Sequence, residues 1–229
     1  RFKVLSELLG DSDTTLFVDA GNFVDGASSV KDGILSLHRP LGFEMLRRLK
    51  PAALVPGETE LAAGPTAFLA EAKKAQLQYV ASNWRTTKKE LALPPYILKT
   101  VPSPHGPVRL VFLGVIDPSI LNWVPRIELE GVELEDPVEA VEALVTKLQQ
   151  LESPPDSIIL LTTASPNSLR KLKALEGLDL VLGDVHSQTE RIESAEYKVR
   201  EHIDNPVIAT LPVDGISVTN LRFRKNPPG

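Results

Sequence analysis

The stretch LFVDAGNFVDG, residues 16–26, joins a short apolar run to a group of polar residues and glycines. The apolar residues 16–18 predict a buried strand, and Asp19, Gly21 and Asn22 then fall at its carboxyl end. In α/β proteins, ligands and catalytic groups gather at this end of the sheet. The stretch therefore predicts one strand of an α/β fold and the first part of a strand-end site.

Four other predicted strands end in polar residues in the same way. Their apolar runs cover residues 52–55, 79–82, 157–161 and 178–182. The first run is followed by Pro-Gly-Glu-Thr-Glu, the second by an asparagine, the third by two threonines and the fourth by Gly-Asp-Val-His-Ser. We therefore expect one site at a sheet edge that is assembled from distant parts of the chain.

Helices are predicted between these strands, because apolar residues recur there at helical spacing. The expected helices cover residues 43–49, 66–77, 136–151 and 165–175, and a further helical spacing covers residues 1–10. The third begins with an Asp-Pro pair, which are favoured residues for the N-cap and the first helical position.

Two strand pairs complete the predicted fold. Residues 96–101 and 108–116 are joined by Ser-Pro-His-Gly, and residues 207–211 and 217–224 by a segment that contains Asp-Gly; both are hairpin signals. The element order predicts an α/β protein with two mixed sheets packed together and flanked by helices. No feature divides residues 1–229 into two cores, so we expect a single domain.

Composition restricts the function classes. The net charge is −5, and no basic face is visible, which disfavours nucleic acid or an anionic membrane as the partner. The chain has no cysteine, which excludes disulfides, zinc–thiolate sites and iron–sulfur clusters within it. No apolar run is long enough to span a bilayer, and no signal peptide is visible. Because the chain starts at Arg1 without a methionine, we expect a processed or trimmed fragment.

Several segments, taken in order, resemble motifs of the calcineurin-like metallophosphoesterases, specifically the catalytic domain of the 5′-nucleotidase branch. VDAGNFVDG is similar to the DAGD segment of that branch, LVPGETEL to its GNHEFD block, YVASNW to its next strand, and LDLVLGDVHSQT to the strand that ends in GGHSHT. The likeness covers nearly the whole chain, and the order of the blocks is more specific than any one of them. The resemblance implies an α/β/β/α sandwich of two mixed sheets flanked by helices.

The resemblance also implies two-metal hydrolysis, in which two divalent ions bind the phosphoryl oxygens and supply a hydroxide nucleophile. The family's metal and catalytic residues are nevertheless replaced here. Its bridging aspartate falls on Asn22, its asparagine ligand on Glu58, its catalytic histidine on Thr59 and a later histidine ligand on Thr163. Threonine has no pKa suited to general acid catalysis near neutrality.

The remaining family motifs match in part. In the last motif an ungapped match places Val185 and Ser187 on the two histidines, whereas a shift by one residue keeps His186 and places Gln188 on the second. Asp19 and Glu60 match, but in the family these are supporting positions rather than ligands. The family's first motif, Asp-x-His, has no counterpart, so we expect that the N-terminal strand carrying it is missing.

We therefore expect a degenerate, non-catalytic domain that binds another protein or an anionic small molecule. The alternative is an active metal-dependent phosphoesterase with altered ligands and two divalent ions. The candidate residues are His186 for catalysis; Asn22, Thr163 and Ser187 for substrate binding; and Glu58, Glu60, Asp184 and His186 for a single calcium or magnesium ion. By resemblance to an exported family, the expected location is periplasmic or extracellular.

Overall fold

Among the residues that the structure describes, the main sheet has five strands and is mixed. The computed structural model describes residues 15–23, 35–118, 131–184 and 207–211. The strand order is β4-β5-β7-β8-β9, in which β4 runs antiparallel to β5 and the other neighbours are parallel. The strands are β4 (Tyr96–Val101), β5 (Val108–Val115), β7 (Ser157–Thr162), β8 (Leu180–Asp184) and β9 (Val207–Leu211).

Two smaller sheets accompany it. One joins β1 (Val18–Asp19) in parallel to β2 (Ala53–Leu54), and a single bridge links Leu54 to Tyr79. The other joins β3 (Trp84–Thr86) to β6 (Val132–Leu134) in antiparallel pairing.

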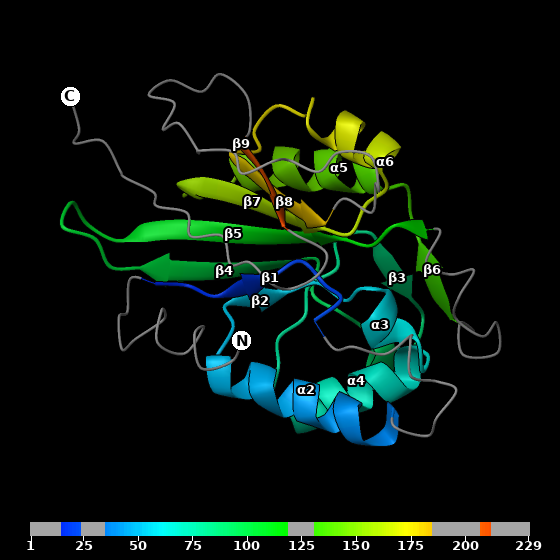
Figure 1. Cartoon of the computed structure of the whole chain (residues 1–229). Coiled ribbons are helices and arrows are strands. Elements are labelled where there is room, and N and C mark those ends of the chain that lie inside the picture. The colour runs from blue at the N-terminus through cyan, green and yellow to red at the C-terminus, as the bar shows by residue number, and fades with distance from the viewer. Residues whose placement is uncertain (1–14, 24–34, 119–130, 185–206, 212–229) are drawn as a thin grey trace.

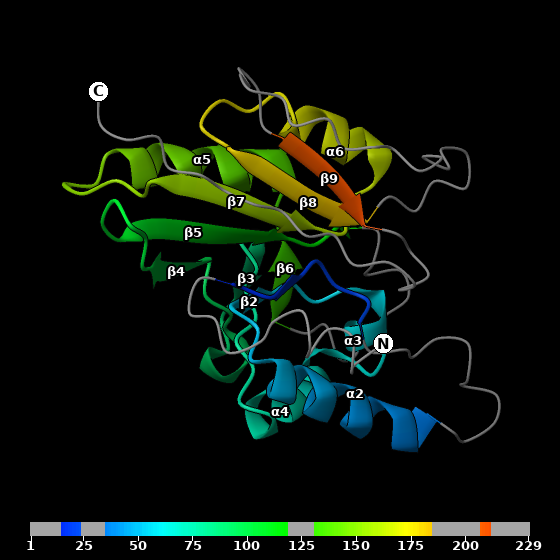
Figure 2. The same ribbon diagram turned by 60° about the vertical axis from the view of Figure 1, so that its left-hand side comes forward.

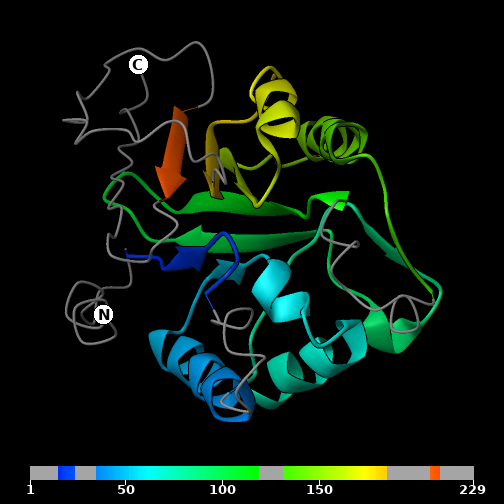
Figure 3. The same cartoon turned by 45° about the vertical axis from the view of Figure 1, so that its right-hand side comes forward.

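The helices enclose the sheets from both sides. They are α2 (Leu35–Leu49), α3 (Glu58–Leu61), α4 (Pro65–Lys74), the short 3-10 helix η2 (Lys89–Leu91), α5 (Pro137–Gln149) and α6 (Pro166–Leu172). Helices α5 and α6 cover one face of the main sheet, whereas α2 and α4 lie on the opposite side, beyond β1 and β2 (Figures 1 and 3). This confirms the predicted α/β/β/α layering. Within the described residues, no helix is long and apolar enough to cross a membrane.

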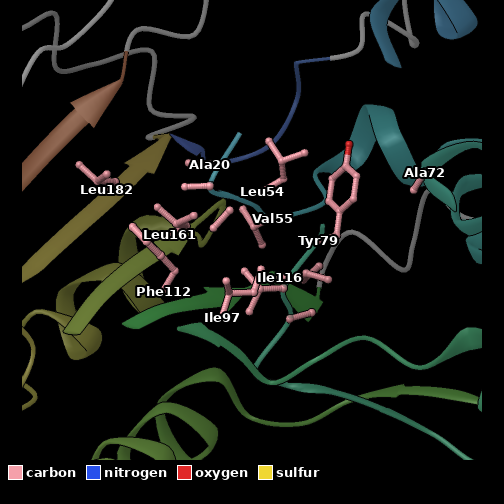
Figure 4. Close-up of a cluster of buried hydrophobic side chains, with 14 of the residues drawn as sticks. Ala20, Leu54, Val55, Ala72, Tyr79, Ile97, Phe112, Ile116, Leu161 and Leu182 are labelled. Atoms are coloured by element: carbon pink, nitrogen blue, oxygen red, sulfur yellow. The ribbon is translucent and has the colours of Figure 1, made fainter. Parts of the chain in front are cut away.

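The core has two parts, one on each face of the main sheet. Strand β5 contributes to both, because its alternate residues point to opposite faces. Phe112 packs with Leu54 and Leu161 between the sheets (Figure 4), whereas Val111 and its neighbours pack against Val145 of α5. Burial on both faces explains why β5 reads as a continuous apolar run rather than as an alternating one.

Several local predictions are confirmed. The hairpin between β4 and β5 has the expected strands, with Tyr96 opposite Leu113 and Val101 opposite Val108. Helix α5 begins as predicted, since Asp136 Oδ1 accepts hydrogen bonds of 2.8 and 3.1 Å from the first-turn backbone N–H groups. The predicted helix over residues 1–10 and the strand over 217–224 lie outside the described residues.

The prediction of a strand over residues 79–82 is wrong, because the segment forms one isolated bridge and no ladder. Its backbone N–H groups bond to three different segments: Val80 to Leu54, Ala81 to Pro94 and Ser82 to Gly114. A segment that changes partner at each residue forms no ladder. It instead connects the layers, and Gly114 permits the approach, because a Cβ there would lie 2.3 Å from the carbonyl oxygen of Val80.

The helix predicted over residues 43–49 is too short. Helix α2 begins at Leu35 and contains Pro40. Because a proline inside a helix removes one backbone hydrogen bond, Pro40 disfavours a helix that extends across it, and the predicted helix began after it. The short elements α3, β3 and β6 were not predicted, because segments of three or four residues carry too little periodicity.

Candidate functional site

The chain turns sharply after β1. Gly21 and Asn22 both have left-handed backbone conformations, with φ of 106° and 61°. Glycine adopts this conformation freely, and asparagine is one of the few other residues that tolerate it. The carboxylate of Asp19 accepts a hydrogen bond of 2.9 Å from the backbone N–H of Gly21, which closes the turn. This turn directs Asn22 toward the loop that follows β2.

Glu60 holds the loops after β1 and β2 together. Its side chain is buried, and the residue is only 1% exposed. One carboxylate oxygen, Oε2, accepts hydrogen bonds of 2.9 Å from the backbone N–H groups of both Asn22 and Gly57. Hydrogen bonds to an ionised acceptor are stronger than those between neutral groups. Glu60 therefore fixes the geometry of the loop pair.

The side chain of Asn22 is engaged by Thr59. Its amide oxygen accepts a hydrogen bond of 3.2 Å from the backbone N–H of Thr59 and a longer one of 3.5 Å from the Thr59 hydroxyl. The amide oxygen is the atom of Asn22 that can bind a cation. In this structure it stabilises the start of α3 instead.

A third loop, which follows β7, approaches the loop after β1 through Thr163. A Cβ added to Gly21 would lie 2.7 Å from the Thr163 methyl carbon. Thr163 is 7% exposed, and its hydroxyl oxygen is buried without a hydrogen-bond partner in the described structure. The neighbouring Thr162 caps the strand end, since its hydroxyl oxygen accepts a hydrogen bond of 2.9 Å from the backbone N–H of Ala164. The structure thus brings together Asn22, Thr59, Glu60 and Thr163, which come from three of the five predicted strand ends.

Comparison with solved structures relates this arrangement to known folds. The chain superposes on a 5′-nucleotidase precursor from Thermus thermophilus with a TM-score of 0.64 and 22% identity, over 80% of this chain and 34% of that one. It superposes on the calcineurin-like phosphoesterase YfkN from Bacillus subtilis with a TM-score of 0.63 and 24% identity, over 80% of this chain and 61% of that one.

The chain has the fold of the calcineurin-like phosphoesterases and 5′-nucleotidases. The NAD nucleotidase NadN of Haemophilus influenzae is a further neighbour, with a TM-score of 0.64 and 16% identity over 80% of this chain and 35% of that one. The chain thus spans about a third of the two nucleotidases and less than two thirds of YfkN. No protein-family model and no curated protein sequence matches it.

In the described loops of this nucleotidase-like fold, the residues at the family's ligand and catalytic positions supply mostly neutral donor atoms. Asn22, Thr59 and Thr163 offer only neutral oxygens, and the Glu60 carboxylate oxygen Oε2 faces two backbone N–H groups. Across the described ranges, no three histidine, aspartate or glutamate side chains are grouped so that they could hold a metal ion. A two-ion centre needs several charged or imidazole ligands, and loss of each lowers metal affinity.

The other candidate residues are placed only in part. Glu58 is the first residue of α3 and is half-buried. Asp184 is the last residue of β8 and lies opposite Leu211 of β9. His186 and Ser187 lie outside the described residues, as do Val185 and Gln188. A single-ion site that uses Glu58, Asp184 and His186 therefore stays a prediction.

Two features of the site were missed in the sequence. The first is Gly57, where a Cβ would lie 2.3 Å from the Asn22 amide oxygen. The second is the role of Glu60 as an acceptor for backbone N–H groups rather than as a candidate ligand. A signal for the second was present, because glutamate three residues after an N-cap position is a capping-box pattern.

We expect Gly57→Ala to lower the free energy of unfolding by about 2 kcal/mol, the usual range for overpacking a tight site. The added carbon would lie 2.5 Å from the backbone nitrogen of Asn22, so the loop must move. Urea denaturation measures the effect. The matched control is Gly106→Ala in the hairpin, where φ is 95° but no atom lies within 4 Å of the added carbon. The control should cost about 1 kcal/mol, and an equal loss in both variants would contradict the close contact of the loops.

Proposed function

We propose that this nucleotidase-like domain does not carry out two-metal hydrolysis and acts as a binding module for another protein or an anionic small molecule. The observation that carries the proposal is the hydrogen bonding among Asn22, Thr59 and Glu60. Each of these residues stands where the resembling family has a metal ligand, catalytic residue or supporting residue. Here they bond to one another and to the loop backbone.

The chemistry of the replaced residues supports the same conclusion. A bridging ligand must neutralise part of the charge of two cations, and the neutral amide of Asn22 does this poorly. Thr59 and Thr163 carry hydroxyls, which neither act as general acids near neutral pH nor replace imidazole as a ligand. These three changes lie on loops that follow three different strands, β1, β2 and β7.

A hydrolysis assay tests the proposal. The protein is incubated with bis-p-nitrophenyl phosphate or with AMP, after addition of manganese, zinc, magnesium or calcium. We expect no turnover above the protein-free control with any of the ions. Turnover that is abolished by Glu58→Gln or by His186→Ala would contradict the proposal and favour an active phosphoesterase with altered ligands. A variant with a distant exposed change, Glu142→Gln, controls for contaminating phosphatase.

The periplasmic or extracellular location is part of this proposal and rests on the resemblance to the 5′-nucleotidase branch. Fractionation of cells that express the natural gene tests it directly.

A further inference from the structure

The outer edge of β4 takes no part in the site described above. Among the described strands, β4 is the first in the order of the main sheet, and β5 is its one neighbour. In the described structure, no backbone group of Tyr96–Val101 forms a hydrogen bond outside the ladder with β5. On an edge strand, every second residue directs its N–H and C=O groups away from the sheet. Figures 1 and 2 show β4 at this margin of the sheet.

A groove with a volume of about 610 Å³ lies beside this edge. Its lining is largely apolar, and Leu69 of α4, Leu77 and Leu93 contribute to it together with Ile97 and Leu98 of β4. Leu98 is 44% exposed, so its apolar side chain is accessible from solvent beside the groove. In the part of the chain that the structure describes, the unpaired backbone edge and the apolar groove are thus adjacent and share residues of β4.

The charges around the groove favour an anionic occupant. Two lysines line it, the exposed Lys73 at the end of α4 and Lys99 in β4, against one carboxylate, Glu90. The Lys99 ammonium group donates a hydrogen bond of 3.2 Å to the side chain of Gln78, which also lines the groove. A lysine on an edge strand discourages pairing with an uncharged strand. A carboxylate on the incoming strand converts the same lysine into a favourable contact.

We propose that the β4 edge binds an extended segment of a partner protein in which apolar residues alternate with acidic residues. The segment adds a strand to the main sheet, with backbone hydrogen bonds to β4, apolar side chains in the groove and carboxylates near Lys73 and Lys99. A second copy of this chain fits less well. Pairing of β4 with β4 of another copy would bring the positively charged Lys99 side chains of both copies to the same interface, where they repel each other. The proposal rests on the binding role proposed above and names its surface and partner class.

Peptide binding to the whole chain tests this proposal. The probe is a fluorescein-labelled peptide of eight residues in which glutamate alternates with valine. One control peptide has lysine in place of glutamate. A second keeps the glutamates but carries an N-methyl group on every residue, so that neither edge of the peptide can pair. Binding is measured by fluorescence anisotropy, and protection of the Tyr96–Val101 amides is measured by hydrogen exchange.

We expect the acidic peptide to bind and to slow exchange in β4, and both control peptides to bind at least tenfold more weakly. Lys73→Glu should weaken binding roughly fivefold, from loss and reversal of one exposed ion pair. Lys74→Glu is the matched control, since Lys74 is an exposed neighbour that does not line the groove, and it should have little effect.

Three results would overturn the inference: no binding of the acidic peptide, equal binding of the N-methylated peptide, or concentration-dependent protection of β4 without any peptide. The last result would assign the edge to a second copy. The hydrolysis assay is independent of all three. If neither peptide binding nor turnover is observed, only this inference is contradicted. If turnover is observed, the proposed function is contradicted.

Discussion

Glu60→Ala is expected to lower the free energy of unfolding by about 4 kcal/mol. The substitution leaves two backbone N–H groups, those of Asn22 and Gly57, without the carboxylate oxygen that both contact at 2.9 Å. Hydrogen bonds to a charged group contribute about 1.5–3 kcal/mol each, and buried unsatisfied donors add a desolvation cost. Urea denaturation monitored by circular dichroism measures the loss.

Two control variants separate the role of Glu60 in the loops from a general effect of mutation. Glu60→Gln keeps an oxygen in the same place, so about half of the loss should be recovered, because neutral hydrogen bonds are weaker. Glu142→Ala removes an exposed glutamate of α5 and should change stability by less than about 0.5 kcal/mol. If Glu60→Ala cost no more than Glu142→Ala, the carboxylate would not hold the loops, and its availability as a metal ligand would have to be reconsidered.

Asn83→Asp is expected to be as damaging, at about 4 kcal/mol, or to prevent folding. Asn83 is fully buried, and its amide nitrogen donates to the carbonyl oxygens of Ile116 at 2.9 Å and of Glu135 at 3.2 Å. Its amide oxygen accepts a hydrogen bond of 3.1 Å from the backbone N–H of Ile116. Aspartate would place a buried negative charge opposite two carbonyl oxygens.

The matched control is Asn167→Asp, which makes the same chemical change at an exposed position in α6 and should be nearly neutral. Where Asn83→Asp yields no soluble protein, Asn83→Ala provides the measurement, with an expected loss of about 3 kcal/mol from the unpaired backbone groups. A loss below about 1 kcal/mol for Asn83→Ala would contradict the view that this amide joins the ends of β5 and β6.

Much of the fold could be predicted from local sequence chemistry. The apolar runs of β5 and β7, the hairpin that joins β4 to β5 and the Asp136 cap of α5 depend on neighbouring residues, and each is confirmed. Residues 79–82 were wrongly predicted as a strand, because their apolar character reflects burial between layers. Their hydrogen-bond partners, Leu54, Pro94 and Gly114, are scattered along the chain.

The site was predictable in its location but not in its bonding. Asn22 and Thr59 follow the parallel strands β1 and β2, whose carboxyl ends meet at the same edge of one sheet. Thr163 follows β7 of the main sheet, so its approach to Gly21 depends on the packing of the two sheets. The hydrogen bonds of Glu60 depend instead on the left-handed turn at Gly21 and Asn22 and on the narrow space beside Gly57. These are tertiary features, and hydrophobic periodicity contains no information about them.

The central proposal is that the loops after β1, β2 and β7 do not hold two divalent cations. The most direct measurement is anomalous diffraction from crystals of the protein grown with an excess of manganese. We predict no pair of anomalous peaks near Asn22, Glu58 and Thr163. Two peaks about 3.5–4 Å apart at that position, each bonded to protein oxygen or nitrogen atoms, would contradict the claim, because that spacing is typical of a two-metal hydrolytic centre.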